Sequence, residues 1–176
     1  MVIIDIDTYM QKLTAKEYYS LEAPILFSEE DNRFNKHLGF FSIGEQKYKF
    51  SWNSEIEPAI ELLSSSIYGI GIDQHFCLLN SACGAFCHWD LDTPFLFMMV
   101  YEKNVFVICE TNILIISLDF FKTEKEYMFY DIVSQVEFEN WNMRIRFISN
   151  KELVIPLHDD SNPHLVIKDA CHKETV

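Results

Sequence analysis

The sequence predicts an α+β domain that is predominantly antiparallel β-sheet, with one or two N-terminal helices and at least seven strands after Ile67. Short apolar runs recur beyond Ile67 and are separated by polar breaks at intervals of about 8–12 residues, which indicates a meander or propeller-like hairpins. The two predicted helices both lie before that point, each with a capping-box pattern at its start. A length of 176 residues, 49% of them hydrophobic, suits a single domain with a substantial core.

The N-terminal part, residues 1–66, is expected to mix helix and strand. Val2–Ile6 predicts a short strand. A first helix is expected from Asp7 or Thr8 to about Tyr19, because Thr8-x-x-Gln11 has the capping-box form. Its apolar face consists mainly of Tyr9, Met10 and Leu13. A loop is expected over Leu21 to Lys36, and the alternation in Lys47–Trp52 predicts a half-buried strand.

A second helix is expected from Ser54 to about Leu63. Ser54-x-x-Glu57 is another capping-box pattern, and acids in the first turn suit the helix dipole. Apolar residues follow at positions i, i+3, i+4 and i+7, which gives one apolar face made of Ile56, Ala59, Ile60 and Leu63.

Residues 67–158 form the expected β-rich core, and residues 159–176 form a tail. Val105–Cys109 and Ile113–Leu118 are apolar on both faces, so they should be central strands, whereas Arg144 and Arg146 give their strand one solvated face. The predicted strands are Ile67–Ile72, Phe76–Leu79, Ala85–Trp89, Phe95–Tyr101, Val105–Cys109, Ile113–Leu118, Glu126–Tyr130, Val133–Glu139, Met143–Ile148 and Leu153–Leu157.

The chain is strongly acidic, with a net charge of −13 from 27 acids and 14 bases. Such a surface repels phosphate groups and anionic lipids, so direct nucleic-acid and membrane binding are disfavoured and a cationic partner is the natural complement. Charge that serves only solubility is the alternative. The N-terminus has no basic start or long apolar run, and the expected location is the cytoplasm. The oligomeric state is not indicated.

Between Lys49 and Lys103 the sequence contains no lysine or arginine but seven acids. A surface of one sign speeds capture of an oppositely charged partner. The segment His88-Trp89-Asp90-Leu91-Asp92 pairs a large aromatic with two carboxylates in a predicted loop. Interface hot spots are enriched in Trp, so this loop is the first candidate contact. The predicted partner-binding residues are Trp89, Asp90, Asp92, Glu55, Glu57 and Glu61, the last three also being explained by helix capping.

No enzyme motif is evident: the sequence has no P-loop, no dinucleotide fingerprint and no zincin motif. We therefore expect a non-enzyme with no catalytic residue, no cofactor and no metal. Five cysteines without a signal sequence indicate free thiols, and the spacing of Cys83, Cys87 and His88 matches no paired zinc motif. The alternative is a small-ligand sensor or Cys/His-dependent enzyme with a pocket near His75, Cys77, Cys83, Cys87 and His88; an adaptor or scaffold is a third reading.

The region from Phe95 to Leu157 resembles small bacterial immunity proteins encoded beside polymorphic or contact-dependent growth-inhibition toxins. The resemblance lies in a strand ending at Tyr101, a VFVICET strand with Glu110, the strand Ile113–Leu118 and a closing acidic-aromatic hairpin. It implies a non-catalytic antitoxin that binds a cognate toxin domain. Immunity families differ in contact surface, so no family site is carried over. Many such toxins are nucleases, whose basic clefts an acidic inhibitor would block sterically and electrostatically.

Overall fold

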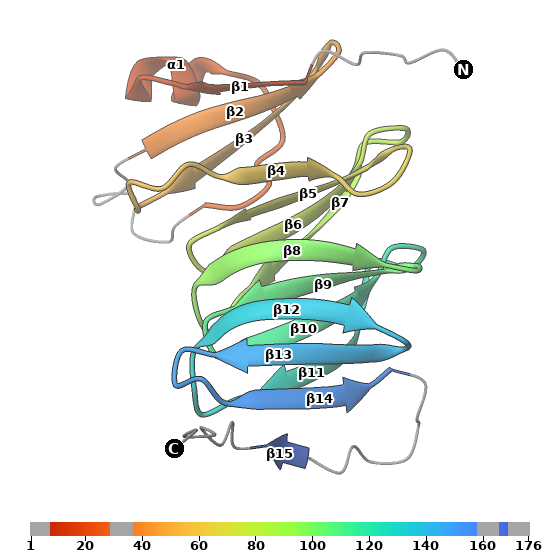
Figure 1. Ribbon diagram of the computed structural model, residues 1–176. Coiled ribbons are helices and arrows are strands. Elements are labelled where there is room, and N and C mark those ends of the chain that lie inside the picture. Colours follow the sequence, from red (N-terminus) through yellow and green to blue (C-terminus); the bar gives the residue numbers. More distant parts are fainter. Residues whose placement is uncertain (1–7, 29–36, 158–165, 169–176) are drawn as a thin grey trace. The chain divides into compact units, whose positions relative to one another are not determined.

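The computed structural model describes residues 8–28, 37–157 and 166–168, and the secondary structure of these residues is mostly antiparallel β-sheet with one short helix. The chain divides into two compact units, residues 1–98 and 99–176. The strands form four sheets in which sequence neighbours pair, with the orders β1-β2-β3, β4-β5-β6-β7, β11-β10-β9-β8 and β12-β13-β14-β15 (Figure 1). The expectation of hairpin-connected antiparallel sheet is therefore confirmed.

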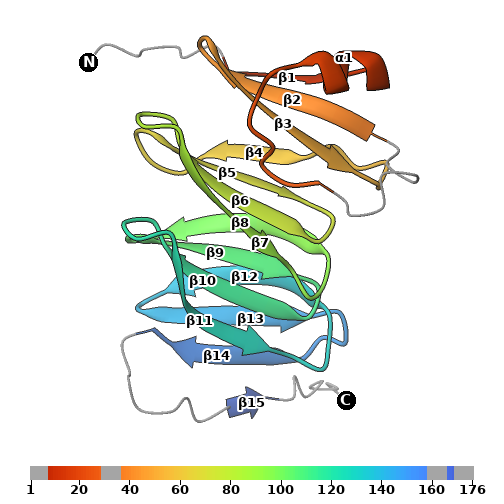
Figure 2. The ribbon, with the colours of Figure 1, turned by 180° about the vertical axis from the view of Figure 1, so that it is seen from behind.

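The first sheet contains β1 (Thr8–Lys12), β2 (His37–Ile43) and β3 (Gln46–Trp52). The helix α1 (Ala15–Ser20) follows β1 and lies beside this sheet in both views (Figures 1 and 2). A parallel bridge from Ile25 to Lys49 adds the segment around Ile25 to the free side of β3. The predicted strand Val2–Ile6 lies outside the described residues.

The first predicted helix is wrong over most of its length. Thr8–Lys12 pairs with β2 in register from Thr8↔Ile43 to Lys12↔Gly39. Only six residues, Ala15–Ser20, are helical, and the capping box is formed by Thr14 and Glu17 instead of Thr8 and Gln11. Pairing with the edge of β2 satisfies the backbone of residues 8–12, so tertiary structure overrides local helix preference.

The second predicted helix is absent. Residues 54–58 form an irregular connection and residues 59–62 form β4 (Ala59–Leu62), which pairs with β5 from Ala59↔Gly71 to Leu62↔Tyr68. The Ser54 hydroxyl accepts a hydrogen bond from the backbone N–H of Ile56, two residues on, which is a turn contact. Ile56 is 71% exposed, whereas Ile60 is partly buried against the core, so the expected apolar residues do not share one buried face.

The second sheet is completed by β5 (Ile67–Ile72), β6 (His75–Asn80) and β7 (Ala85–Asp90). One face of this sheet packs on the first sheet. Side chains of both sheets form a common core with Leu26 and Phe27, and its strand members are Phe41, Ile43, Tyr48, Phe50, Trp52, Tyr68, Ile70, Ile72, Cys77 and Leu79.

The third sheet contains β8 (Phe95–Tyr101), β9 (Asn104–Cys109), β10 (Asn112–Ser117) and β11 (Lys122–Met128). β9 and β10 lie in the middle of the sheet, and Val105–Cys109 and Asn112–Ser117 are buried throughout. The expectation of two central strands, apolar on both faces, is confirmed. β11, at the edge, has four charged residues, and five of its seven residues are exposed.

The fourth sheet contains β12 (Val133–Glu139), β13 (Asn142–Phe147), β14 (Glu152–Pro156) and β15 (Val166–Lys168). It packs on the third sheet through aromatic rings. The centroid of Phe138 lies 4.7 Å from those of Tyr101 and Phe106, and Phe129 and Phe147 are 5.4 Å apart. These contacts give residues 99–176 a core of their own.

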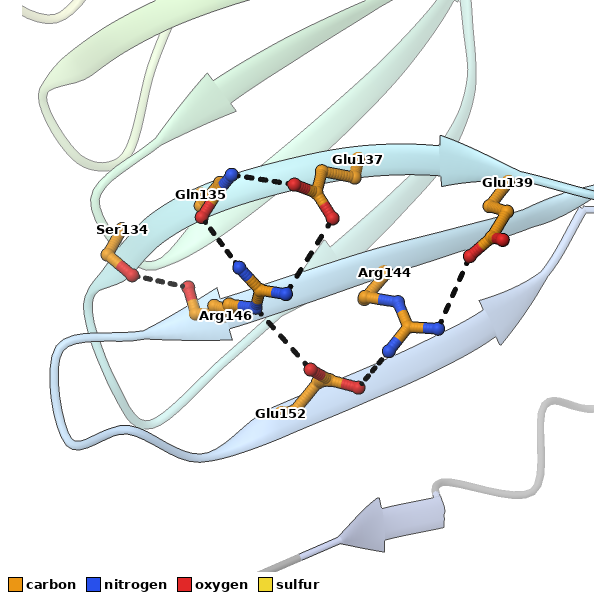
Figure 3. A network of polar contacts seen from close by, with 7 residues as sticks. All are labelled: Ser134, Gln135, Glu137, Glu139, Arg144, Arg146 and Glu152. Atoms are coloured by element: carbon orange, nitrogen blue, oxygen red, sulfur yellow. Dashed lines mark hydrogen bonds and ion pairs between the residues drawn. The ribbon is translucent and has the colours of Figure 1, made fainter. Parts of the chain in front are cut away.

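The predicted solvated face of β13 is confirmed. Met143, Ile145 and Phe147 are buried, whereas Arg144 and Arg146 project to the other face. Figure 3 shows the resulting network: the two guanidinium groups contact side chains on both neighbouring strands, namely Gln135, Glu137, Glu139 and Glu152. Both described arginines are thus paired within their own sheet.

Candidate functional site

The predicted binding residues all belong to the first unit and lie at both edges of the second sheet. Trp89 and Asp90 are the last residues of β7, and Asp92 lies in the connection that follows. Glu61 is on β4, at the opposite edge of the same sheet. Three strand spacings, roughly 14 Å, separate those edges. Glu55 and Glu57 precede β4.

Trp89 and Asp90 point to opposite faces of the second sheet because successive strand residues alternate. Trp89 is opposite Phe76 in the register, and their rings lie 6.0 Å apart. The Phe95 ring stacks on Phe76 at 6.3 Å and covers Gly71, where an added Cβ would lie 2.5 Å from that ring. Trp89 is therefore half-buried in an aromatic row, with part of its surface exposed.

The predicted acids are all exposed, but some of their charge is compensated. The Glu57 carboxylate lies 2.7 Å from the Lys12 ammonium, and Glu55 lies 3.2 Å from His37. No lysine or arginine of the described residues is within ion-pair distance of Glu61 or Asp92. Asp73, another acid of this segment, accepts hydrogen bonds from the backbone N–H groups of Asn53 and Ser54, so its role is structural.

A shallow pocket of about 200 Å³ opens beside this acidic region. Its walls include apolar groups of Ile56, Phe95 and Leu96 and the acids Glu57 and Asp73. A lysine or arginine of a partner has a matching shape, an aliphatic stem with a cationic end. A second pocket of about 320 Å³ lies in the other unit and includes Phe129, Tyr130 and Phe147; no sequence pattern predicts it.

The cysteines and histidines of the alternative site are only partly brought together. His75 and Cys77 on β6, and His88 on β7, share the face that packs on the first sheet. Cys87 faces the other way, opposite Leu78, and Cys83 is exposed in the turn between the strands. No disulfide joins the described cysteines, Cys77, Cys83, Cys87 and Cys109. Burial raises the pKa of the Cys77 thiol strongly, with Cys87 adding to the effect, so Cys77 is a poor nucleophile.

Register pairing assembles a group that the sequence analysis did not identify as a unit. His75 is opposite Asp90, and the His88 ring is one pair further along the same face. His75 Nδ1 lies 3.1 Å from His88 Nε2, and the Asp90 carboxylate lies 3.2 Å and 3.3 Å from these two nitrogens. Phe27 stacks on both imidazoles, at 5.1 and 5.6 Å. This cluster has the donor atoms of a metal site.

No protein-family model matches the sequence, and a comparison with curated proteins gives no match. Solved structures do show likenesses. The β-propeller domain of Cps50 (Swd1) from Myceliophteria thermophila aligns with a TM-score of 0.53 and 8% identity over 69% of this chain. Sqt1 from Saccharomyces cerevisiae aligns with a TM-score of 0.50 and 12% identity over 76% of this chain.

These likenesses concern the fold alone, and this chain spans less than half of either structure, 42% and 44%. They agree with the observed succession of antiparallel sheets made of neighbouring strands. Within the described residues, no helix has the length and apolar character needed to cross a membrane.

Proposed function

We propose that this chain is a non-catalytic binding protein that captures a basic protein partner, and that the partner is a toxin domain, in the first place a nuclease. The observation that carries the proposal is the absence of lysine and arginine from residues 50–102 together with the exposure of six of their seven acids. Glu61 and Asp92 provide charge that the described bases do not offset. A one-signed surface of this kind accelerates association with a cation.

A nuclease is the favoured partner because its active cleft must attract phosphate and is therefore basic. An acidic protein lying over that cleft excludes nucleic acid both by its bulk and by its charge. The pocket lined by Ile56, Glu57 and Leu96 supports the same reading, since its apolar wall suits the aliphatic stem of a long basic side chain. The Glu57 carboxylate beside it already pairs with Lys12 at 2.7 Å.

Durable binding requires more than surface charge, and Trp89 is the proposed anchor. Its half-buried ring is supported by Phe76, so it is positioned before the partner arrives and loses little conformational freedom on binding. Asp90 does not share its face and interacts with two histidines, so the anchor and this acid act separately.

Binding of the chain itself to nucleic acid is disfavoured by the arrangement of its cations. Arg144 and Arg146 are committed to carboxylates and to Gln135 on the fourth sheet. Lys49 donates to the carbonyl oxygens of Tyr18 and Leu21. Phosphate binding needs several cations directed at the ligand, and these groups are instead directed at the protein.

A cysteine-dependent enzyme is the weaker alternative. Catalysis needs a thiolate and a base within hydrogen-bond reach. Cys77 is the thiol nearest the histidines in the register, but it is fully buried and its pKa is raised. Cys83 and Cys87 are not on the histidine face. Without an available thiol, His75, His88 and Asp90 are better suited to binding a ligand than to covalent catalysis.

Immunity proteins are encoded beside their toxins, so the test is whether this chain neutralises the protein encoded by the gene next to its own. We expect co-expression of this chain to restore growth of cells producing that protein, and the two chains to co-purify as a stable complex. Purified complex should show no nuclease activity until the two chains are separated. An unrelated acidic protein of similar charge serves as the control for non-specific pairing. Failure to neutralise, or equal protection by the control protein, would refute the proposal.

A further inference from the structure

Three polar atoms form a nearly equilateral triangle on the face of the second sheet that packs on the first. Its corners are His75 Nδ1, His88 Nε2 and a carboxylate oxygen of Asp90, and its edges measure 3.1, 3.2 and 3.3 Å. The His75 and His88 side chains are only 10% and 25% exposed, whereas Asp90 is 80% exposed. The two histidine corners are therefore enclosed by the protein, and the aspartate corner is open to solvent.

Hydrogen bonding alone does not account for all three edges. Each ring nitrogen is either a donor with one proton or an acceptor, never both. If His75 Nδ1 donates to His88 Nε2, it has no second proton for Asp90. If both nitrogens donate to Asp90, no proton lies on the edge between them. In every protonation state at least one edge lacks a proper hydrogen bond, although its atoms are in close contact.

A metal ion accounts for all three distances at once. Zinc binds histidine nitrogen and carboxylate oxygen at about 2.0–2.1 Å, so two ligands of a tetrahedral ion lie roughly 3.3 Å apart. The observed edges approach that value. Two histidines and one carboxylate are also the ligand types of zinc sites that keep a fourth position for water, and of some ferrous sites.

The surroundings of the triangle suit a cation. Phe27 stacks on both imidazole rings and limits their rotation, which lowers the entropy lost when they bind an ion. The exposed Asp90 provides the entry path.

We infer that His75, His88 and Asp90 bind one divalent transition-metal ion, Zn²⁺ in the first place, with a fourth position left for water or another ligand. This inference does not rest on the proposed function. It departs from the sequence-based expectation of no metal, which considered cysteine spacing. Here no cysteine is a ligand, and the three residues come together only through the pairing of β6 with β7. The ion would join the end of the edge strand β7 to β6.

The test is titration of the full, metal-free chain with Zn²⁺ and, separately, with Co²⁺. We expect one ion per chain, a rise in Tm, and visible Co²⁺ absorption of a tetrahedral nitrogen–oxygen site without a thiolate band. Asp90→Asn and His88→Gln should each weaken binding at least tenfold, since even loss of a supporting outer residue costs about 10–100-fold. Asp92→Asn removes the same charge two residues away and should leave affinity unchanged.

Circular dichroism would first confirm that each variant is folded, and Asp90, being exposed, is the variant least expected to disturb folding. Absence of binding by the unmodified chain would overturn the inference. So would equal affinities for the unmodified chain and Asp90→Asn, or a Co²⁺ spectrum with thiolate charge transfer, because the ion would then lie elsewhere.

Discussion

At the scale of single residues, the acids of residues 50–102, the base-free segment without lysine or arginine, have different roles that charge alone does not distinguish. Asp73 has a positive φ of 49°, and its carboxylate accepts backbone hydrogen bonds of 2.9 and 3.0 Å from Asn53 and Ser54. Its carbonyl oxygen also accepts from the Phe95 N–H. It thereby holds the connection before β4 and the start of β8 at one turn. Glu61, in contrast, is exposed on an edge strand.

Asp73→Ala should lower the free energy of unfolding by about 1–3 kcal/mol, because two backbone donors lose their acceptor. Asp73→Asn keeps a side-chain oxygen and tolerates a positive φ, so its loss should be clearly smaller. Urea unfolding measures both. Equal losses for the two variants would show that the side-chain oxygen does not hold this connection.

Thiol reactivity provides a second residue-scale prediction. Cys77 is buried and its pKa is raised, whereas Cys83 is exposed in the turn after β6. In the folded protein at pH 8, iodoacetamide should modify Cys83 rapidly and leave Cys77 unmodified until the chain is unfolded. Peptide mass spectrometry over time reports both sites. Modification of Cys77 at the rate of Cys83 would contradict its burial.

At the scale of elements, the strands were predictable where hydrophobic pattern and burial agree. Ile67–Ile72, Phe95–Tyr101 and Val133–Glu139 have the expected bounds, and most others differ by one or two residues. β11 is the exception, because it begins at Lys122, four residues before the predicted start. Its exposed, charged residues lack the apolar pattern on which the prediction depended.

The two helix predictions failed for a common reason. Ser54 and Thr8 have capping-box spacing, but a strand edge was available to pair with each following segment. The pattern within each segment does not report that edge, which β2 supplies to the first segment and β5, the next strand along the chain, supplies to the second. The helix pattern of Ile56, Ala59 and Ile60 equally permits a short strand of four residues, and Pro58 immediately precedes it.

Close packing of β5 against side chains of β8 gives a prediction at this scale. An added Cβ on Gly71 would lie 2.5 Å from the Phe95 ring, so Gly71→Ala should lower the free energy of unfolding by about 1–3 kcal/mol. An added Cβ on Gly69 would lie 2.5 Å from the Met98 sulfur and 2.8 Å from Leu63 Cδ1, two side chains that can change rotamer, so Gly69→Ala should cost less. Thermal or urea unfolding compares the two. A greater loss for Gly69→Ala would show that the aromatic packing is not the limiting contact.

At the scale of the whole molecule, the acidic character and the base-free segment were evident from the sequence. Which of the candidate site residues lie together was not. The sequence placed Trp89, Asp90 and Asp92 together in one loop. The structure places Trp89 and Asp90 on opposite faces of a strand and Glu61 at the other edge of the sheet. The histidine–aspartate triangle depends on strand register, which composition and spacing do not specify.

Charge on the first unit is the feature on which the proposed capture of a basic partner depends. Glu61 and Asp92 are exposed, belong to the base-free segment and lie outside the histidine cluster. A matched pair of acids outside that segment, Glu45 in the β2–β3 turn and Glu124 on β11, is also exposed. Neutralising either pair changes the net charge equally, so any difference between them depends on position.

The most direct measurement is the rate at which the chain associates with its toxin partner, at low and at high salt. It compares the variant Glu61→Gln/Asp92→Asn with the matched control Glu45→Gln/Glu124→Gln. We expect the first variant to associate several-fold more slowly at low salt, with the difference disappearing at high salt, while the second associates almost as fast as the unmodified chain. Equal rates for both variants at low salt would contradict capture through the base-free segment.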